Sequence, residues 1–443
     1  MLTVAYLANQ FPAAVEPYVM EEIEELRRLG IRVVTGTVTR ANREDEIRGI
    51  PDVVLRPVQG LVLARAVWLC IRRWNQIADL LARALFHGQE GPIRRAKTLL
   101  HTLLGAYYAV RLEEQGVEHI HVHHGFSASW IAMVAARLLD LNFSMTLHGS
   151  DLLLHRAYLD VKLRNCALCL TVSEYNRRFI AAHNPEIEPA KVVVSRLGVE
   201  IPEDGIPSSP AQRSKAEAIR LLAVGRLHGV KDHAFLVRAC AHMQAQDLDF
   251  RCEIAGEGPE RRRLESLIHK LGLEKRVSLL GHVPPEPMDS LYRRADLVVL
   301  TSRSEGIPLV LMEAMVRGKL VLAPAITGIP ELVIAGKTGF LYQPGSMKDF
   351  LEKVLEISCL LRRVPLLAQE RHERWGLNDL PSRPSPNDHS HRLDWVRHAA
   401  RVQVCHNFNR RNNLQSFADV FLGRVSPPPA KDRPHASSVL QQI

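Results

Sequence analysis

The chain has few cysteines and no long apolar segment. Its 443 residues include seven cysteines, too few for the disulfide framework of a small secreted domain. Their odd number indicates a reducing compartment. No uninterrupted apolar run reaches the roughly 18–20 residues that a membrane-spanning helix needs. No basic region or small-residue cleavage site marks a signal peptide. We therefore expect a cytoplasmic protein.

Positive charge exceeds negative charge, but only locally. The formal net charge is +9, and residues 61–100 contribute seven basic side chains against two acidic ones. Most of the remaining excess lies in residues 359–443. Neither segment carries a base-stacking pattern or a zinc-finger signature, so no nucleic-acid partner is predicted. The amphipathic stretch within 61–100 is either an ordinary surface helix or a helix that rests on an anionic membrane.

Short strand-like runs alternate with helical patterns twice along the chain, which predicts an α/β protein. Two such runs predict two doubly wound, Rossmann-like domains that face each other across a cleft. We expect a first domain over residues 1–200, a linker over 201–217 and a second domain over 218–358. An atypical and partly loop-like segment should follow over 359–407. A terminal helix over about 408–424 should pack back on the first domain, and residues 425–443 should form a disordered tail.

The most informative stretch lies in the second half, where a buried strand at 297–301 ends in a polar turn. Pro308 then opens a helix at a position where proline is tolerated. Ligands of parallel sheets bind at the carboxyl ends of strands, and the free amides of a helix start favour phosphate. Glu305 in the turn and Glu313 on the helix could reach one elongated ligand, because carboxylates accept hydrogen bonds from paired hydroxyls.

Two other strand ends carry matching chemistry. Arg226 and Lys231 follow the first strand of the second half and could hold a pyrophosphate from two sides. Gly256 and Gly258 form a turn after the next strand, where glycine lets the backbone approach a ligand closely. Together these elements predict a phosphate-containing ligand in the second domain.

With these motifs the sequence resembles the retaining GT-B glycosyltransferases of family four, and within them the colanic-acid and exopolysaccharide type. The resemblance covers most of residues 1–350. The matching residues are Gly225-Arg226…Lys231, Gly256-Glu257-Gly258-Pro259, Gly281-His282-Val283, Ser304-Glu305-Gly306…Glu313-Ala314 and Gly328-Ile329-Pro330-Glu331…Gly336-Lys337-Thr338-Gly339.

The resemblance implies a role for each matching residue. Arg226 and Lys231 would neutralise the donor diphosphate, Glu305 would bind hydroxyls of the transferred sugar, and Glu313 would hold the ribose. The remaining donor-binding residues would be Gly225, Gly256, Gly258, Gly306, Ile307, Pro308, Leu309 and Val310. The donor would be a UDP-, GDP- or ADP-linked sugar, which is a substrate, and no cofactor is expected.

The first half contains two candidate sites. In the strand around residues 119–123, alternation places His119, His121 and His123 on one face. A histidine cluster suggests zinc, but no neighbouring carboxylate or cysteine in the sequence completes a ligand set, so no metal is predicted and His123 is assigned to the acceptor side. His148 follows the next strand, and by the resemblance it faces the reacting sugar. Asp151 either caps a helix or faces the acceptor.

The predicted function is therefore that of a retaining glycosyltransferase in the biosynthesis of bacterial exopolysaccharide or another cell-surface polysaccharide. The acceptor would be a glycan or a lipid-linked sugar, at the inner face of the membrane if the basic segment binds lipid. Two alternatives stay open. One is another GT-B enzyme, a sugar-nucleotide epimerase or a phosphorylase. The other is a catalytically impaired nucleotide-sugar-binding scaffold, suggested by the atypical segment 359–400.

Overall fold

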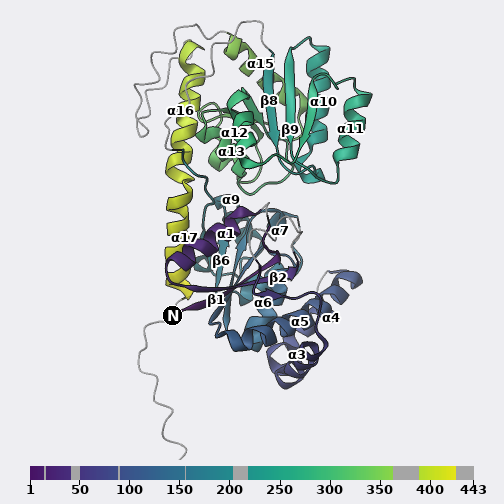
Figure 1. Cartoon of the computed structure of the whole chain (residues 1–443), viewed down its shortest axis with the longest axis vertical. Helices are drawn as coiled ribbons and strands as arrows, with labels where there is room; N and C mark the ends of the chain where they lie inside the picture. Colours follow the sequence, from purple (N-terminus) through teal and green to yellow (C-terminus); the bar gives the residue numbers. More distant parts are fainter. Residues whose placement is uncertain are drawn as a thin grey trace, which may run out of the picture. The chain divides into compact units, whose positions relative to one another are not determined.

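Two parallel β-sheets with helices packed around them make up the chain in the computed structural model (Figure 1). The structure describes residues 1–13, 16–40, 50–87, 90–154, 156–202, 218–362 and 389–425. Most of the predicted linker and all of the predicted tail beyond residue 425 lie outside this range. Among the described residues, no helix combines the length and the hydropathy that crossing a bilayer requires. The predicted α/β class is confirmed.

The chain divides into two compact units that are not simple halves of the sequence. The first unit contains residues 1–146, 157–170 and 415–443, and the second contains residues 147–156 and 171–414. This division differs from the boundaries expected from the sequence, because residues 147–156 and 171–200 group with the second unit. The His148 turn therefore belongs to the same unit as Lys231 and Glu305.

The first sheet has the strand order β3-β2-β1-β4-β5-β6-β7, which is the Rossmann order extended by one strand. Its strands are β1 (Thr3–Gln10), β2 (Arg32–Thr39), β3 (Val53–Val54), β4 (His119–His123), β5 (Asn142–Leu147), β6 (Leu168–Thr171) and β7 (Val192–Val194). The pairs that join β3, β2, β1, β4 and β5 are all parallel.

Helix α1 (Pro17–Arg28) of the first unit buries one apolar face. It begins with proline in its first turn and buries Val19, Ile23 and Leu26, which recur at helical spacing. Gly30, with a φ of 82°, follows its end. The other helical elements are α3 (Gly60–Arg72), η1 (Trp74–Gln76), α4 (Ala78–Leu85), α5 (Pro92–Leu112), η2 (Glu113–Gln115), α6 (Ser127–Leu138) and α8 (Leu159–Asn165).

The second sheet repeats the same topology. Its order is β10-β9-β8-β11-β12-β13, and every pair is parallel. Its strands are β8 (Ile219–Val224), β9 (Phe250–Ala255), β10 (Val277–Gly281), β11 (Leu297–Val299), β12 (Leu320–Pro324) and β13 (Phe340–Tyr342). Separate hydrophobic clusters cover its two faces, as a doubly wound domain requires.

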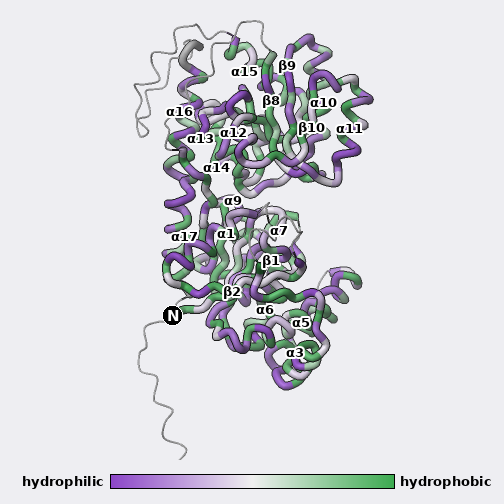
Figure 2. Tube along the Cα trace, viewed as in Figure 1, coloured by the Kyte–Doolittle hydropathy of each residue, from purple (hydrophilic) through white to green (hydrophobic). Residues whose placement is uncertain are grey.

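The helical elements of the second unit follow the same alternation. They are α7 (Ser150–Leu153), α9 (Glu174–His183), η3 (Pro189–Lys191), η4 (Gly229–Lys231), α10 (His233–Ala245), α11 (Arg261–Lys270), α12 (Pro285–Arg294), α13 (Leu309–Val316), α14 (Ile329–Leu332), α15 (Met347–Arg362) and α16 (His389–Asn407). Hydrophobic residues run along the strands, and hydrophobic and hydrophilic residues alternate along the helices that cover them (Figure 2).

The two carboxyl-terminal helices, α16 and α17 (Arg410–Val425), contribute to different units. α16 contributes Trp395 and Val396 to one cluster of the second unit and Val404 to the other, so residues 389–407 are helical where the sequence predicted a partly loop-like segment. Residues 363–388 of that segment lie outside the described range. α17 begins in the second unit and ends in the first. There Phe421 packs edge-on against the rings of His119 and His121 in β4.

Candidate functional site

Lys231 and Glu305, two predicted site residues, form an ion pair. The Lys231 Nζ lies 2.6 Å from Glu305 Oε1, and both side chains are largely shielded from water. Lys231 lies in η4 after β8, and Glu305 follows β11, which is the neighbouring strand in the sheet. Adjacent parallel strands end at the same edge, so residues 74 positions apart meet there.

The backbone around Lys231 is fixed from the strand end that leads to Glu305. The Thr301 hydroxyl donates to the Lys231 carbonyl at 3.0 Å. Arg303 donates its backbone amide to Val230 and its guanidinium to Asp232, at 2.8 Å each. Asp232 also accepts from the Phe235 amide at the start of α10. The two loops are therefore one hydrogen-bonded structure.

Arg226 stands in the same loop but is exposed. Its guanidinium has no hydrogen bond or ion pair within the described ranges. A guanidinium without a carboxylate partner is free to bind an anion such as phosphate. Lys231 is therefore already neutralised by Glu305, whereas Arg226 has no carboxylate partner among the described residues.

The glycine turn after β9 packs directly on the loop that carries Arg226. A Cβ on Gly256 would lie 2.0 Å from the Gly225 carbonyl oxygen, and one on Gly258 would lie 2.4 Å from that of Leu227. Both glycines also have φ values near +150°, which other residues rarely adopt. The close approach that requires glycine here is between two protein loops. Their predicted contact with a ligand stays a prediction.

His148 and Gly306 are neighbours in the second unit. A Cβ on Gly306 would lie only 2.0 Å from the His148 carbonyl oxygen, and one on Gly149 would lie 2.8 Å from the Gly306 nitrogen. A Cβ on Gly328, which precedes α14, would lie 2.3 Å from the Gly306 carbonyl oxygen. The His148 turn is thus held against the Glu305-Gly306 turn by backbone contact, and this brings two predicted sites from distant parts of the sequence together.

Asp151 is buried and holds the turn that carries His148. Its carboxylate accepts hydrogen bonds from the amides of His148, Gly149 and Leu152. Asp151 is the second residue of α7, two positions beyond the N-cap, which is Gly149. It therefore fixes the turn without being the helix cap that the sequence predicted. The alternative role at the acceptor side stays a prediction.

The start of α13 supplies the amides predicted to meet a phosphate. Pro308 precedes the helix as its cap residue, and Leu309 and Val310 form its first turn. No side chain caps this end, and first-turn amides have no acceptor within their own helix. Ile307 is buried beneath the turn. The helix start is therefore suited to bind an anion.

Glu313 is held by a tyrosine that the sequence did not indicate. The Tyr292 hydroxyl, from α12, donates to Glu313 Oε2 at 2.7 Å. Burial, reinforced by the Glu313 charge, raises the pKa of Tyr292 well above its usual value, so this hydroxyl keeps its proton. The Arg317 guanidinium lies 5.1 Å from the centre of the Tyr292 ring. Tyr292 therefore orients the carboxylate predicted to bind ribose.

Two buried serine hydroxyls close to these loops lack protein partners among the described residues. The Ser302 and Ser304 hydroxyls are buried and have no hydrogen-bond acceptor or donor among the described residues. Buried hydroxyls normally find a partner, so water or a ligand must supply one here. His233, at the start of α10, is also buried, and burial lowers its pKa, so its ring is neutral near pH 7.

Glu331, a residue of the motifs that carry the family resemblance, binds the start of helix α9. Its carboxylate accepts from the amides of Glu174 and Tyr175, at 3.0 and 2.7 Å, in the first turn of α9. Ser173 caps the same helix through the Asn176 amide. A carboxylate at a helix start stabilises the helix, so Glu331 anchors α9 within the second unit.

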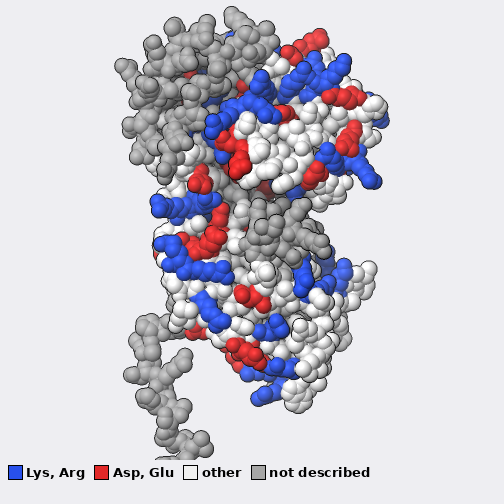
Figure 3. Space-filling view, viewed as in Figure 1, with Lys and Arg blue, Asp and Glu red and all other residues white. Residues whose placement is uncertain are grey.

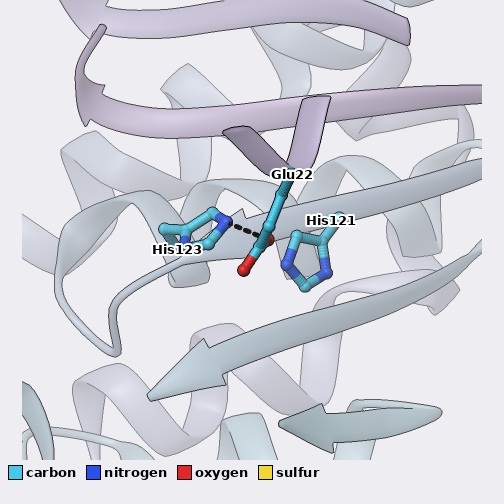
Figure 4. Close-up of side chains that lie close together, drawn as sticks. All are labelled: Glu22, His121 and His123. Atoms are coloured by element: carbon cyan, nitrogen blue, oxygen red, sulfur yellow. Dashed lines mark ion pairs between the residues drawn. The ribbon is translucent and has the colours of Figure 1, made fainter. Parts of the chain in front are cut away.

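In the first unit, Glu22 completes a cluster that the sequence did not predict. Potential ligand atoms of Glu22, His121 and His123 all lie within 4.8 Å of one another, and the three side chains are buried. Figure 4 shows Glu22 projecting between the two rings. Its Oε2 lies 3.0 Å from His123 Nε2. The sequence argument that no carboxylate is near was wrong, because Glu22 is distant in sequence but adjacent in the fold.

The hydrogen bonds of this cluster describe a network made of protein groups. His121 contacts the hydroxyls of Ser144 and Thr146 through its two ring nitrogens, at 2.7 and 3.1 Å. His119 contacts the same Ser144 hydroxyl at 2.7 Å. His121 thus has a hydroxyl at each ring nitrogen, and His123 lies beside the Glu22 carboxylate. The predicted absence of a metal and the predicted acceptor role of His123 stay predictions.

The second half of the chain matches a known family. Residues 207–360 match the family model described as glycosyl transferases group 1. The chain is 33% identical over 176 residues to WcaL of Salmonella typhimurium, named as a colanic acid biosynthesis glycosyltransferase, which covers 38% of this chain and 43% of that protein. It is 30% identical over 174 residues to AmsK of Erwinia amylovora, an amylovoran biosynthesis glycosyltransferase, covering 38% and 42%. These matches span less than half of either relative.

Solved structures agree with the fold over the whole chain. HepE of Anabaena, solved in complex with UDP and glucose, aligns with a TM-score of 0.63 and 20% identity, over 96% of this chain and all of that one. Sucrose-phosphate synthase of Thermosynechococcus elongatus aligns with a TM-score of 0.67 and 16% identity, over 96% and 99%. The fold is therefore that of the GT-B glycosyltransferases, as the sequence predicted.

Proposed function

We propose that this protein is a glycosyltransferase that moves a sugar from a nucleotide-sugar to a glycan or lipid-linked acceptor, in the biosynthesis of bacterial exopolysaccharide or another cell-surface polysaccharide. The observation that carries the proposal is the Lys231–Glu305 pair, 2.6 Å apart at neighbouring strand ends inside the group 1 domain. The relatives named for colanic acid and amylovoran biosynthesis support the polysaccharide assignment. The UDP bound by HepE supports a nucleotide-linked donor, which would be a UDP-, GDP- or ADP-sugar.

The donor diphosphate would replace Glu305 as the partner of Lys231. Lys231 would then contact phosphate together with Arg226, whose guanidinium is exposed and unpaired among the described residues. The first-turn amides of α13 would add hydrogen bonds to the same group. Released from Lys231, Glu305 would accept hydrogen bonds from hydroxyls of the transferred sugar. In this exchange Lys231 has an anionic partner both before and after the donor binds.

The ribose would bind to Glu313. A carboxylate can accept from two adjacent hydroxyls at once, and Tyr292 already fixes one oxygen of Glu313. The remaining oxygen lone pairs point to the position of the 2′- and 3′-hydroxyls in this proposal. No cofactor is required, because the nucleotide-sugar is itself the substrate.

Transfer would proceed with retention of configuration. The bond between the sugar C1 and the diphosphate oxygen breaks, and the acceptor oxygen forms a bond to C1 on the same face. The acceptor proton passes to an oxygen of the departing diphosphate, so no protein base is assigned. Arg226, Lys231 and the helix start stabilise the charge that develops on the diphosphate. His148 is assigned to the reacting sugar, since its turn packs on Gly306.

The acceptor is assigned mainly to the first unit, which contains His123. Asp151, the other predicted acceptor-side residue, lies in the second unit, and both side chains are buried. They would act through the turns and the strand end that they hold. A lipid-linked acceptor would bring the first unit to the inner face of an anionic membrane.

The test begins with the nucleotide. Thermal shifts with UDP, GDP, ADP and CMP identify the base, and transfer is then measured as release of that nucleotide from its sugar conjugates. Lys231→Ala should reduce transfer by about a hundredfold or more, since it removes a charge-stabilising group at the leaving diphosphate. Lys348→Ala, at a fully exposed lysine of α15, is the matched control. Unchanged turnover in Lys231→Ala would refute the assignment.

The same measurements separate the alternatives. An epimerase would convert the donor sugar without an acceptor, and a phosphorylase would show the absorbance of bound pyridoxal phosphate. A scaffold protein would bind nucleotide and release none with any acceptor. No thermal shift with any of the four nucleotides would count against all nucleotide-sugar functions.

A further inference from the structure

Large hydrophobic side chains are exposed on one helical segment of the first unit. Ten of the sixteen exposed large hydrophobic residues in the described part of the chain lie between residues 58 and 100. All three aromatic residues of that set are among them. The most exposed members are Leu61, Trp68, Ile71, Trp74, Phe86 and Ile93, at 54–79% of their full accessibility. Scattered single residues need no explanation, but such a concentration does.

Helix α3 carries apolar side chains on its outer side as well as on its buried side. Ala66 and Leu69 face inward and are buried. Leu61, Trp68 and Ile71 recur at intervals of seven and three residues, which places them on the opposite side. In Figure 3 the surface over α3 carries few charged side chains. Both sides of this helix are therefore apolar, and only one of them is covered by the unit.

The charges around these side chains are positive. Arg72, Arg94 and Lys97 are exposed and have no ion pair among the described residues. The only acidic residues between positions 55 and 100 are Asp79 and Glu90, which pair with Arg137 and Arg83. Every acidic charge of the segment is neutralised, while three basic charges are not. An occupant of this surface must be both apolar and anionic.

We infer that this segment docks the protein on an anionic phospholipid bilayer. The docking surface consists of Leu61, Trp68, Ile71, Trp74, Phe86 and Ile93, with Arg72, Arg94 and Lys97. Tryptophan and phenylalanine enter the boundary between headgroups and acyl chains, and arginine and lysine bind anionic headgroups. The inference deepens the proposed function and rests on it for the acceptor, because a lipid-linked acceptor lies in the bilayer.

Binding to vesicles tests the inference directly. The full chain is sedimented with vesicles of phosphatidylcholine alone and of phosphatidylcholine with one quarter phosphatidylglycerol. Binding should require the anionic lipid and weaken with salt. Trp68→Ala with Trp74→Ala should weaken binding at least about tenfold. Reversal of Arg72, Arg94 and Lys97 to Glu should weaken it about a hundredfold, at roughly 1 kcal/mol for each basic residue near the surface.

Matched variants on the second unit control for general effects of charge and hydrophobicity. Ile334→Ala with Leu355→Ala removes two exposed apolar side chains there. Arg251, Lys270 and Lys348, all exposed, are reversed to Glu as the charge control. Neither control should change binding. All of these side chains are on the surface, so the variants should fold, and circular dichroism verifies this.

Tryptophan fluorescence supplies a second readout. Trp68 and Trp74 are exposed in the free protein, so vesicles should shift the emission to shorter wavelength, and brominated lipids should quench it. Trp68→Phe with Trp74→Phe should lose most of that quenching. Vesicle binding that survives both the aromatic and the charge variants would overturn the inference. The inference would also be overturned if the protein does not bind vesicles and instead forms a dimer that Trp68→Ala dissociates.

The outcome is separable from that of the proposed function. Nucleotide thermal shifts should be unchanged in every docking variant, because the nucleotide residues lie in the second unit. Lys231→Ala should bind vesicles as the wild type does. Loss of docking with retained nucleotide release concerns the surface alone, and the reverse pattern concerns the transfer assignment alone.

Discussion

Acid should destabilise the first unit through His119. This histidine lies in β4 and is almost completely buried, and burial lowers its pKa from 6.5 to about 3. In the unfolded chain the ring returns to its ordinary pKa. The folded-state pKa is depressed, so the stability contribution is complete above pH 6.5. It is lost as the pH falls toward 3, because the unfolded state takes up a proton that the folded state refuses.

The magnitude follows from the size of the shift. A shift of about 3.5 pKa units at ~1.4 kcal/mol per unit amounts to about 5 kcal/mol over the full range. Between pH 7 and pH 5 the loss is about 2 kcal/mol. Since domains have only about 5–15 kcal/mol of stability, the effect of this single ring on the free energy of unfolding should be measurable. His101 has a pKa lowered to about 4 by burial and acts in the same direction.

The assay must report the first unit by itself, since a two-domain chain need not unfold in one step. Hydrogen exchange of peptides from β4 and α6, followed across a urea series at pH 7 and pH 5, meets this need. His119→Gln removes the titrating group and keeps a polar side chain near Ser144. The wild type should lose about 2 kcal/mol more than this variant between the two pH values.

Histidine at the surface provides the control. His87→Gln, at an exposed position of the same unit, should show the acid sensitivity of the wild type. His101 is present in all three proteins, so its effect cancels. Equal acid sensitivity of wild type and His119→Gln would refute the reasoning that burial keeps this ring neutral.

Two further predictions concern the site in the second unit. Gly306→Ala should reduce transfer at least about tenfold, because its Cβ would meet the His148 carbonyl at 2.0 Å and displace that turn; Gly423→Ala, which meets nothing within 4 Å, is the control, and unchanged kcat would contradict the packing argument. Tyr292→Phe should weaken nucleotide binding about tenfold by freeing Glu313; equal affinity by titration calorimetry would show that Glu313 needs no such support.

Local patterns in the sequence were sufficient for the fold. In α1, Pro17–Arg28, proline, apolar spacing and the following Gly30 are all local signals for the helix and its end. The strand expected around residues 119–123 is β4, His119–His123. Strand order also followed, since alternating strands and helices allow few topologies. Residues 389–407, the described end of the segment predicted to be atypical, form α16, whose apolar positions contact two different clusters and so lack a single periodic face.

The site could be predicted only as far as its residues stand at strand ends. Lys231 and Glu305 were each identified from a strand end, and the sheet order then brings them to 2.6 Å. Tyr292 and Glu22 carry no such mark. Each is a polar residue on an amphipathic helix, and only the packing of that helix against a particular strand or helix brings it to its partner.

This difference has a consequence for how the two units would do their work. In the second unit the site residues come from loops that touch through backbone atoms: Gly256 on Gly225, Gly258 on Leu227, and Gly306 on His148. Side chains larger than hydrogen are excluded at these points, so the loops cannot move independently without losing contact. In the first unit the clustered polar residues Glu22, His121 and His123 are buried. The charge of the leaving diphosphate would thus be stabilised by closely packed loops of the second unit. The first unit would contact the membrane that carries the acceptor through its exposed helices.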